Sequence, residues 1–378
     1  MTRRTLLPAA VALVSLWGAG AAAAASQPPP PAAMTAPAPV APVAPVAPVA
    51  PVAPATPATP AVPAAPTGLD EWARPSAKRL AALWPELAGA DLSRDATRGD
   101  LDRALSILTG APRTSPDPAK PATAWTVNLL FVRALGLEPE RRGLAALSVE
   151  GGQRLRLPRN AASEILAREA GLLYNRPASQ DDRERSRRET VRLADVVYAL
   201  DRARSLSSWQ RARLARYRSV VLPAMSPTRL AAVQAALWQV GQPYIWGGDW
   251  PGVRSPWGAQ GHGGFDCSGL VWWAFKGTTQ AGRLGVGTGL IGRTADQMAF
   301  ERPAERVETA ALQPADLVFF GAGGPAARKG TISHAGIAAG NGWMIHSSGS
   351  KAGVTLSHLD DYWPSATAFG RHVAQVGA

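Results

Sequence analysis

Residues 263–275, GGFDCSGLVWWAF, contain the single cysteine of this 378-residue chain. Two glycines and an aromatic residue lead into Asp266, a residue type favoured at helix N-caps, so the apolar run after it predicts a helix that begins at or near Cys267. This helix is apolar around most of its circumference and is expected to be buried. A thiol in its first turn faces unpaired backbone N–H groups and the positive end of the helix dipole, which stabilise a thiolate. Cys267 is therefore either an inert buried thiol or a nucleophile.

The first 26 residues have the pattern of a secretory signal peptide. Arg3 and Arg4 precede an apolar run over residues 6–20, and small residues at 23–25 satisfy an A-x-A cleavage rule. A membrane anchor is the alternative, but a proline, a serine and a glycine interrupt the run, which is shorter than the roughly 20 residues of a spanning helix. We therefore expect a secreted, cell-wall associated protein, in which a lone thiol cannot form an internal disulfide and must be buried or used.

Residues 27–66 consist almost entirely of Ala, Pro, Val and Thr, with the unit APV repeated over 38–52. The stretch has no charged or aromatic residue and cannot bury a core. Its prolines favour extended polyproline II. It is predicted to be a disordered linker.

Residues 67–225 are predicted to form an all-α domain, because apolar residues recur at helical spacing in 97–108, 124–137, 158–173 and 186–200. Several of these stretches begin alike, with a small residue or proline and then an arginine, which suggests an array of repeated units. The segment resembles the S-layer homology modules, and that resemblance implies a module that binds anionic wall polymers. A plain helical spacer is the alternative.

The charge of this middle segment agrees with either interpretation. The chain has a formal net charge of +12, and residues 67–225 carry 27 basic and 19 acidic groups, the basic ones almost all arginine. Arginine forms bidentate contacts to phosphate and carboxylate, so an exported protein would meet wall polymers or lipid headgroups rather than nucleic acid. A general bias of the chain towards arginine explains the excess equally well.

A further helix is predicted over 227–241, with Pro227 near its first turn and Gly241 at its end. After it the composition changes to glycine, tryptophan and alternating apolar residues. We therefore expect a second domain over residues 226–378.

The stretch SHAGIAAGNGWMIHSSG (333–349) is predicted to be a β-hairpin. A two-residue loop, Asn341-Gly342, would pair residue 346 with 337 and put His334 and His346 on opposite faces of the sheet. A three-residue loop, 340–342, would pair 346 with 336, so that the two histidines lie diagonally on one face. A site that uses both histidines predicts the longer loop.

A nucleophilic cysteine needs a base and a third group that orients the base. His334 is the candidate base and His346 the candidate orienting group. Two other interpretations have less support: no G-x-S-x-G motif surrounds Ser268 as a nucleophile, and a Cys-His-His zinc site would lack close ligand pairs. We predict no metal site.

Four motifs, in this order, resemble the NlpC/P60 family of secreted papain-like cysteine peptidases. They are PYIWGG (243–248), FDCSGLV (265–271), DLVFF (316–320) and SHAGIAAGNGWMIHSS (333–348). The resemblance covers roughly residues 226–376. It implies an α+β, papain-like domain in which the cysteine helix packs on an antiparallel sheet that bears both histidines, preceded here by the all-α domain.

The resemblance also implies roles for six residues. Cys267 would be the nucleophile, His334 the base and His346 the third polar residue. Tyr244 would line the site and help stabilise the oxyanion with the backbone N–H of Cys267, and Asp266 and Ser268 would hold substrate. The implied reaction is hydrolysis of peptidoglycan stem peptides between D-isoglutamate and a diamino acid, without a cofactor.

Two stretches depart from the family pattern. Residues 249–263 form a longer connection than we expect, and 283–298 matches loosely, mainly through Arg293-Thr294. Two rival functions remain open: a non-catalytic wall-binding protein with a vestigial peptidase domain, and a thiol acyltransferase that passes the acyl group to an amine or lipid.

Overall fold

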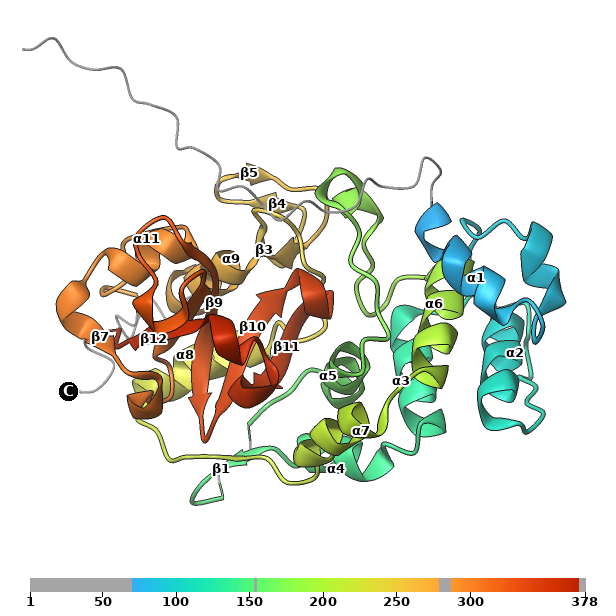
Figure 1. Cartoon of the computed structure of the whole chain (residues 1–378), viewed down its shortest axis with the longest axis horizontal. Coiled ribbons are helices and arrows are strands. Elements are labelled where there is room, and N and C mark those ends of the chain that lie inside the picture. Colours follow the sequence, from blue (N-terminus) through green and yellow to red (C-terminus); the bar gives the residue numbers. More distant parts are fainter. Residues whose placement is uncertain (1–69, 153–154, 279–286, 374–378) are drawn as a thin grey trace, which may run out of the picture. The chain divides into compact units, whose positions relative to one another are not determined.

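The computed structural model describes residues 70–152, 155–278 and 287–373 (Figure 1). Every described residue belongs to one compact unit. The predicted signal peptide (1–26) and linker (27–66) lie outside the described residues. The predicted boundary between residues 225 and 226 stays a prediction.

The described part of residues 67–225 is helical, as predicted. Polar caps begin several of its helices: Thr97 accepts a hydrogen bond from the N–H of Asp100, and Ser207 accepts one from Gln210. The α-helices are α1 (Arg74–Leu80), α2 (Arg98–Thr109), α3 (Ala124–Ala134), α4 (Glu138–Ala145), α5 (Ala161–Glu169), α6 (Leu193–Arg204) and α7 (Ser208–Leu214). The 3-10 turns are η1 (Glu71–Ala73), η2 (Pro85–Gly89), η3 (Ala178–Arg183) and η4 (Ala215–Arg218), and a short parallel pair joins β1 (Ser148–Val149) to β2 (Val221–Leu222).

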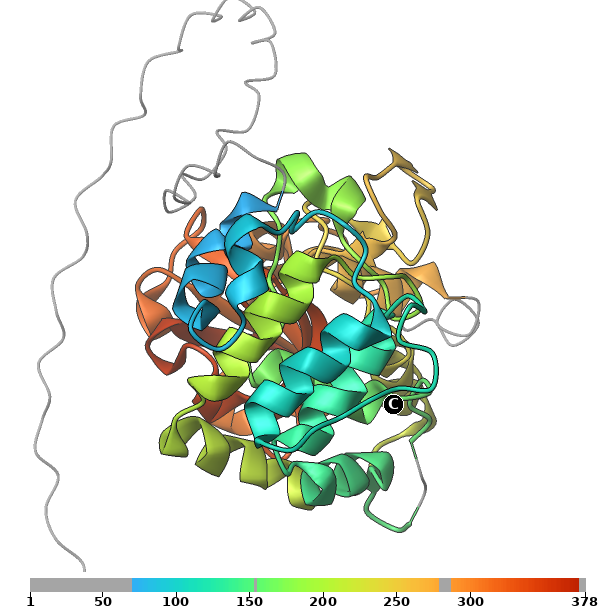
Figure 2. The same ribbon diagram turned by 90° about the vertical axis from the view of Figure 1, so that its right-hand side faces the viewer.

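Three helix starts meet at one point of this helical part. The N–H of Ala96 donates to Val191, that of Val191 to Ala122, and that of Ala122 to Ala96, which closes a ring of backbone hydrogen bonds. The helices that follow, α2, α3 and α6, pack against one another and lie side by side in Figure 2. Because residue 191 is extended to complete the ring, α6 begins at Leu193, later than the predicted start at 186.

The described residues after 225 contain a six-stranded sheet in the order β11-β10-β9-β8-β12-β7, and every neighbouring pair is antiparallel. The predicted antiparallel sheet is confirmed. Figure 1 shows these strands in orange and red. Their bounds are β7 (Arg306–Val307), β8 (Leu317–Gly321), β9 (Ile332–Gly340), β10 (Trp343–Ser348), β11 (Gly353–His358) and β12 (Thr367–Arg371).

Helices α8 (Pro227–Leu237) and α9 (Cys267–Trp272) pack on strands β9 and β10. The side chains of Leu270 and Val271 are fully buried, which confirms the predicted central position of the cysteine helix. A π-helical turn, η5 (Trp273–Gly277), continues α9, and α11 (Ala295–Phe300) also packs on β9. The remaining 3-10 turns are η6 (Pro303–Glu305), η7 (Thr309–Ala311), η8 (Gly324–Ala326), η9 (Gly349–Lys351), η10 (Leu359–Asp361) and η11 (Pro364–Ala366).

The long connection before α9 folds as two small antiparallel pairs. Strand β3 (Asp249–Trp250) pairs with β6 (Gly264–Phe265), and between them β4 (Arg254–Ser255) pairs with β5 (Gly258–Ala259). The Gln260 side chain closes the base of this β4–β5 hairpin: its Nε2 donates to three carbonyl oxygens and its Oε1 accepts the N–H of Asp249.

The hairpin that carries both histidines differs in part from the prediction. Gly340 pairs with Trp343, so the turn is the two-residue Asn341-Gly342, both at positive φ as a type I′ turn requires, and the predicted three-residue loop is wrong. The next pair is Met344 with residue 338, so that β9 carries one extra residue at a bulge. The bulge restores the register that the longer loop would have given. The two histidines therefore lie on one face, as predicted, but because of the bulge and not because of a longer loop.

No helix within the described ranges combines the length and the apolar composition that a membrane-spanning helix needs.

Candidate active site

Asp266 starts helix α9, as predicted. Its carboxylate accepts the N–H of Gly269 at 2.5 Å and the hydroxyl of Ser268 at 3.0 Å. The helix backbone lies directly on the PYIWGG motif: a Cβ on Gly269 would be 2.0 Å from the carbonyl oxygen of Gly248. Cys267 is therefore held by a capped helix start that fits only because residue 269 has no side chain.

The Cys267 thiol is buried between α9 and strand β9. The backbone N–H groups of Ala335, Ser268 and Cys267 itself are its hydrogen-bond donors, and 8% of the residue is exposed. Burial, and then the neighbouring Asp266 charge, raise the pKa of the thiol to about 12, while the backbone donors act in the opposite direction. Because Ala335 directly follows His334, the thiol lies at the strand position that carries the predicted base.

The two predicted histidines are in contact. Nε2 of His334 is 2.8 Å from Nδ1 of His346, and both rings are buried. Burial lowers the pKa of His334 to about 3 and lowers the pKa of His346 well below its usual value. The resting site therefore holds a neutral thiol and two neutral imidazoles.

The hydrogen bonds continue beyond His346 to residues that sequence reasoning missed. His346 Nε2 is 2.9 Å from the hydroxyl of Ser357, and this hydroxyl donates to Glu169 Oε1 at 2.6 Å. Ser357 lies on β11, the neighbour of β10, and Glu169 is the last residue of α5. Ser357 and Glu169 meet because α5 packs against β11, and no spacing in the sequence predicts that contact.

Two tyrosines lie near enough to Cys267 to respond to its charge. Burial, and then the charge of a Cys267 thiolate, raise the pKa of Tyr244, a predicted site residue, and burial chiefly raises that of Tyr362, which was not predicted. The Tyr362 ring packs edge-on against His346 at a centroid distance of 4.4 Å and lies 5.2 Å from His334. Tyr362 directly follows η10, the short 3-10 turn after β11, and nothing in the sequence marks it.

Arg293 brings the predicted substrate-holding residues together. Its guanidinium donates to the Ser268 hydroxyl at 3.0 Å and to the carbonyl oxygen of Gly247 at 3.1 Å, and it lies 3.7 Å from the Asp266 carboxylate. Burial raises the pKa of Asp266, and the Arg293 charge opposes that effect. The sequence had singled out Arg293 only as part of a loose motif match.

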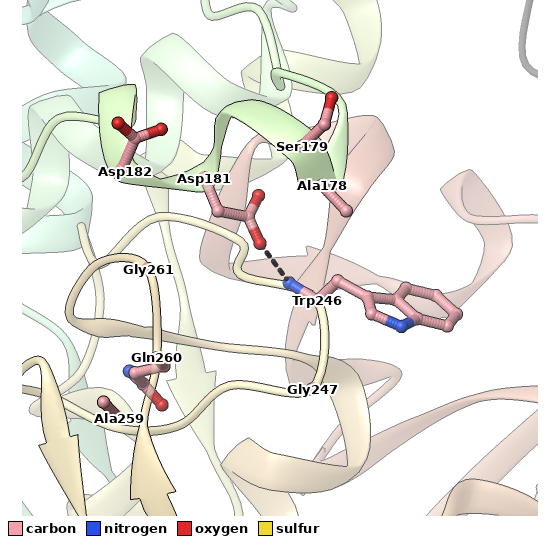
Figure 3. A pocket seen from close by; sticks show the side chains of 9 residues that line it. All are labelled: Ala178, Ser179, Asp181, Asp182, Trp246, Gly247, Ala259, Gln260 and Gly261. Atoms are coloured by element: carbon pink, nitrogen blue, oxygen red, sulfur yellow. Dashed lines mark hydrogen bonds between the residues drawn. The ribbon is translucent and has the colours of Figure 1, made fainter.

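A pocket of about 460 Å³ adjoins this group, and Gly247 belongs to both (Figure 3). Asp181, from η3, lines it and accepts the backbone N–H of Trp246 at 3.0 Å, while burial raises the pKa of Asp181 to about 6. The Trp246 ring is 59% exposed and points away from that carboxylate. The lining residues are Ala178, Ser179, Asp181, Asp182, Trp246, Gly247, Ala259, Gln260 and Gly261.

Known proteins resemble the part of the chain that holds the cysteine and histidines. The model of the NlpC/P60 family matches residues 241–371. The chain is 35% identical over 133 residues to the murein DD-endopeptidase MepH of Escherichia coli, covering 35% of this chain and 41% of MepH. It is 39% identical over 134 residues to the gamma-DL-glutamyl hydrolase of Bacillus subtilis, covering 35% of this chain and 26% of that protein.

A solved structure gives a further comparison. The peptidoglycan hydrolase RipB from Mycobacterium tuberculosis shares 30% sequence identity, with a TM-score of 0.30 and coverage of 39% of this chain and 64% of that one. The matches span less than half the length of the two curated relatives. The family match contains the motifs around Tyr244, Cys267 and both histidines, and residues 241–371 of this chain are a domain of the NlpC/P60 family.

Proposed function

We propose that this protein is a peptidoglycan hydrolase that cleaves stem peptides with Cys267 as nucleophile. The observation that carries the proposal is the contact of the buried thiol with the N–H of Ala335, next to a His334–His346 pair 2.8 Å apart. The named activities of the relatives, a murein DD-endopeptidase and a gamma-DL-glutamyl hydrolase, support this substrate class.

The reaction proceeds through an acyl-enzyme. The sulfur of Cys267 attacks the scissile carbonyl carbon while His334 takes the thiol proton, because burial disfavours a separated thiolate and imidazolium. His334 gives that proton to the leaving amine, and a thioester remains. Water then attacks the thioester with His334 as base, which releases the new carboxylate and the free thiol.

The oxyanion that forms on attack needs donors. The backbone N–H of Cys267 lies at the sulfur, and the Tyr244 hydroxyl is close enough to feel a thiolate charge. We assign these two groups to the oxyanion. His346 orients His334 as the third polar residue.

The cleaved bond is assigned to the junction of D-isoglutamate with the diamino acid. Asp266 and Ser268, held by Arg293, offer an acidic and a hydroxyl group beside the thiol for the polar groups of a stem peptide. The two relatives carry names for different bonds, DD and DL, so product masses decide the bond.

Purified sacculi test the proposal. Wild-type protein should release shortened stem peptides, with masses that identify the bond, and Cys267→Ala should release none. Undiminished release by Cys267→Ala would contradict the mechanism. Products that carry an added amine or lipid, instead of a free carboxylate, would favour the acyltransferase alternative.

The proposed substrate requires export. The N-terminal pattern of residues 1–26 supports a cleaved signal peptide and action at the cell wall. Mass spectrometry of the protein recovered from outside the cytoplasm should find the mature N-terminus near residue 26. An intact N-terminus starting at Met1 would argue against cleavage.

The helical part offers a second, binding function. We propose that residues 67–225 hold the protein on anionic wall polymers, supported by their basic excess and by a cavity of about 480 Å³ lined in part by Arg103 and Arg113. Arg113 already pairs with Asp102, whereas Arg103 donates to a backbone carbonyl. Full-length Cys267→Ala should bind sacculi that retain their anionic polymers and lose most binding when these are removed. Equal binding to both would favour the plain spacer.

A further inference from the structure

A continuous line of hydrogen bonds leads from the predicted base into the helical part of the chain. It runs from His334 to His346 (2.8 Å), from His346 to the Ser357 hydroxyl (2.9 Å), and from that hydroxyl to Glu169 Oε1 (2.6 Å). Ser357 reaches His346 because β10 and β11 pair antiparallel with Thr355 opposite His346, which puts residue 357 on the same face. Glu169 lies outside the matched residues 241–371.

The end of this line is fixed in place. The other carboxylate oxygen of Glu169 pairs with Lys351 Nζ at 2.8 Å, and the Thr355 hydroxyl donates to Oε1 at 3.2 Å. The Glu169 side chain is 6% exposed, and His346 and Thr355 are fully buried. Solvent therefore has little access to rearrange these groups.

The chemistry of Glu169 sets the direction of every bond in the line. A carboxylate only accepts, so Ser357 must donate its single proton to Glu169 and can only accept from His346. His346 then carries its proton on Nε2 and presents an unprotonated Nδ1. His334 must donate from its own Nε2, which leaves its Nδ1 unprotonated and basic. Without the carboxylate, Ser357 could donate to His346 instead and reverse both tautomers.

We propose that Glu169 and Ser357 are positioning residues of the catalytic centre, and that the Glu169 carboxylate, supplied by the helical part, holds both histidines in the tautomers that leave His334 basic. The inference rests on the proposed function of Cys267 and His334. No proton has to travel along the line: the thiol proton moves to His334 and on to the leaving amine. The Glu169 carboxylate, paired with Lys351, also stabilises the imidazolium that forms for an instant.

The test uses the full chain and two readouts. Cys267 is the only cysteine, so its rate of alkylation by iodoacetamide at each pH between 5 and 12 reports the thiol and its base without any substrate. The second readout is kcat and KM against pH with a purified stem-peptide substrate. The variants are Glu169→Gln, Ser357→Ala and the matched control Thr355→Val, which removes a hydrogen bond to the same carboxylate oxygen outside the line.

Glu169→Gln and Ser357→Ala should lower kcat about 10- to 100-fold with little change in KM, by analogy with the loss of the outer partner of a metal-bound histidine. Their alkylation profiles should shift to higher pH. Because Lys351 and Ser357 still hold the Glu169 carboxylate, Thr355→Val should keep the wild-type profile and kcat within twofold. If Glu169→Gln fails to fold, as thermal unfolding would reveal, Ser357→Ala decides the matter alone.

The outcomes separate this inference from the proposed function. Hydrolysis by the wild type, with alkylation profiles of Glu169→Gln and Ser357→Ala that superimpose on it, overturns the inference only. A wild type that releases nothing from sacculi overturns the proposed function, yet shifted alkylation profiles in the two variants would still support the line of hydrogen bonds.

Discussion

Replacing Gly269 with alanine should displace the helix that carries Cys267. In a helix, Gly→Ala ordinarily stabilises by roughly 0.5–1 kcal/mol. Here the new Cβ would be 2.0 Å from the carbonyl oxygen of Gly248, and real Cβ atoms essentially never come within 3.0 Å of such an atom. Because the obstacle is backbone and not a flexible side chain, α9 must move by at least the difference between these two distances.

The size of that displacement sets the expected changes in kcat and Tm. A shift of about 1 Å at a catalytic group can cost roughly 100-fold in rate, so kcat should fall by about that factor. Overpacking of about 1–3 kcal/mol, at about 2–4 °C for each kcal/mol, should lower Tm by about 2–12 °C. The sign is opposite to that of an ordinary helical Gly→Ala change.

The assay compares Gly269→Ala with a matched control in the same region. A Cβ on Gly252 would have its nearest neighbour, Trp250 Cδ1, at 3.9 Å, so Gly252→Ala should keep wild-type activity and Tm. Stem-peptide release is measured well below each Tm. Full activity and an unchanged Tm in Gly269→Ala would show that a Cβ at residue 269 does not displace α9 from the Gly248 carbonyl.

Three further predictions concern the site. Asp266→Asn should lower the pKa of the Cys267 thiol by removing a neighbouring charge, seen as faster iodoacetamide alkylation at neutral pH; slower alkylation would mean that the lost Arg293 pairing dominates. Burial lowers the pKa of His334 in the folded protein to about 3. Between about pH 3 and pH 6.5 the unfolded chain therefore binds more protons than the folded protein does. Stability is thus full above pH 6.5 and falls as the pH drops below it, by up to about 1 kcal/mol per pH unit, and His334→Asn should flatten that slope in Tm measurements. Tyr244→Phe should lower kcat by about 100- to 1000-fold if its hydroxyl serves the oxyanion, whereas a loss below tenfold would indicate a packing role.

Features that depend on a single helix or hairpin could be predicted from the sequence. The helix start at Cys267 depends on Asp266 and on the apolar run after it, all within one turn or two. The shared face of His334 and His346 depends on parity along one hairpin, so it was predicted correctly although the bulge that produces it was not. A one-residue bulge has no marker among small apolar residues.

The site residues that were not predicted are brought together by contacts between segments far apart in the sequence. Glu169 and Ser357 are 188 residues apart and meet only because α5 packs on β11. Tyr362 reaches both histidines from a short turn after the sheet. The sequence also could not show which arginines of residues 67–225 are paired. Many of them form ion pairs with carboxylates of the same part of the chain.

The β4–β5 hairpin is held at its base by the hydrogen bonds of the Gln260 side chain to the backbone on either side, and at its tip the Trp257 ring packs edge-on against Trp272 of α9 at a centroid distance of 5.8 Å. The strand pairing of β3 with β6, and with it the start of α9, is complete below that fastening. Apart from this contact Trp257 is 69% exposed, so the rest of the hairpin tip can change in length and composition while the thiol keeps its place. If the protein cleaves wall peptides as proposed, changes in this stretch would alter which fragments reach the site without moving Cys267.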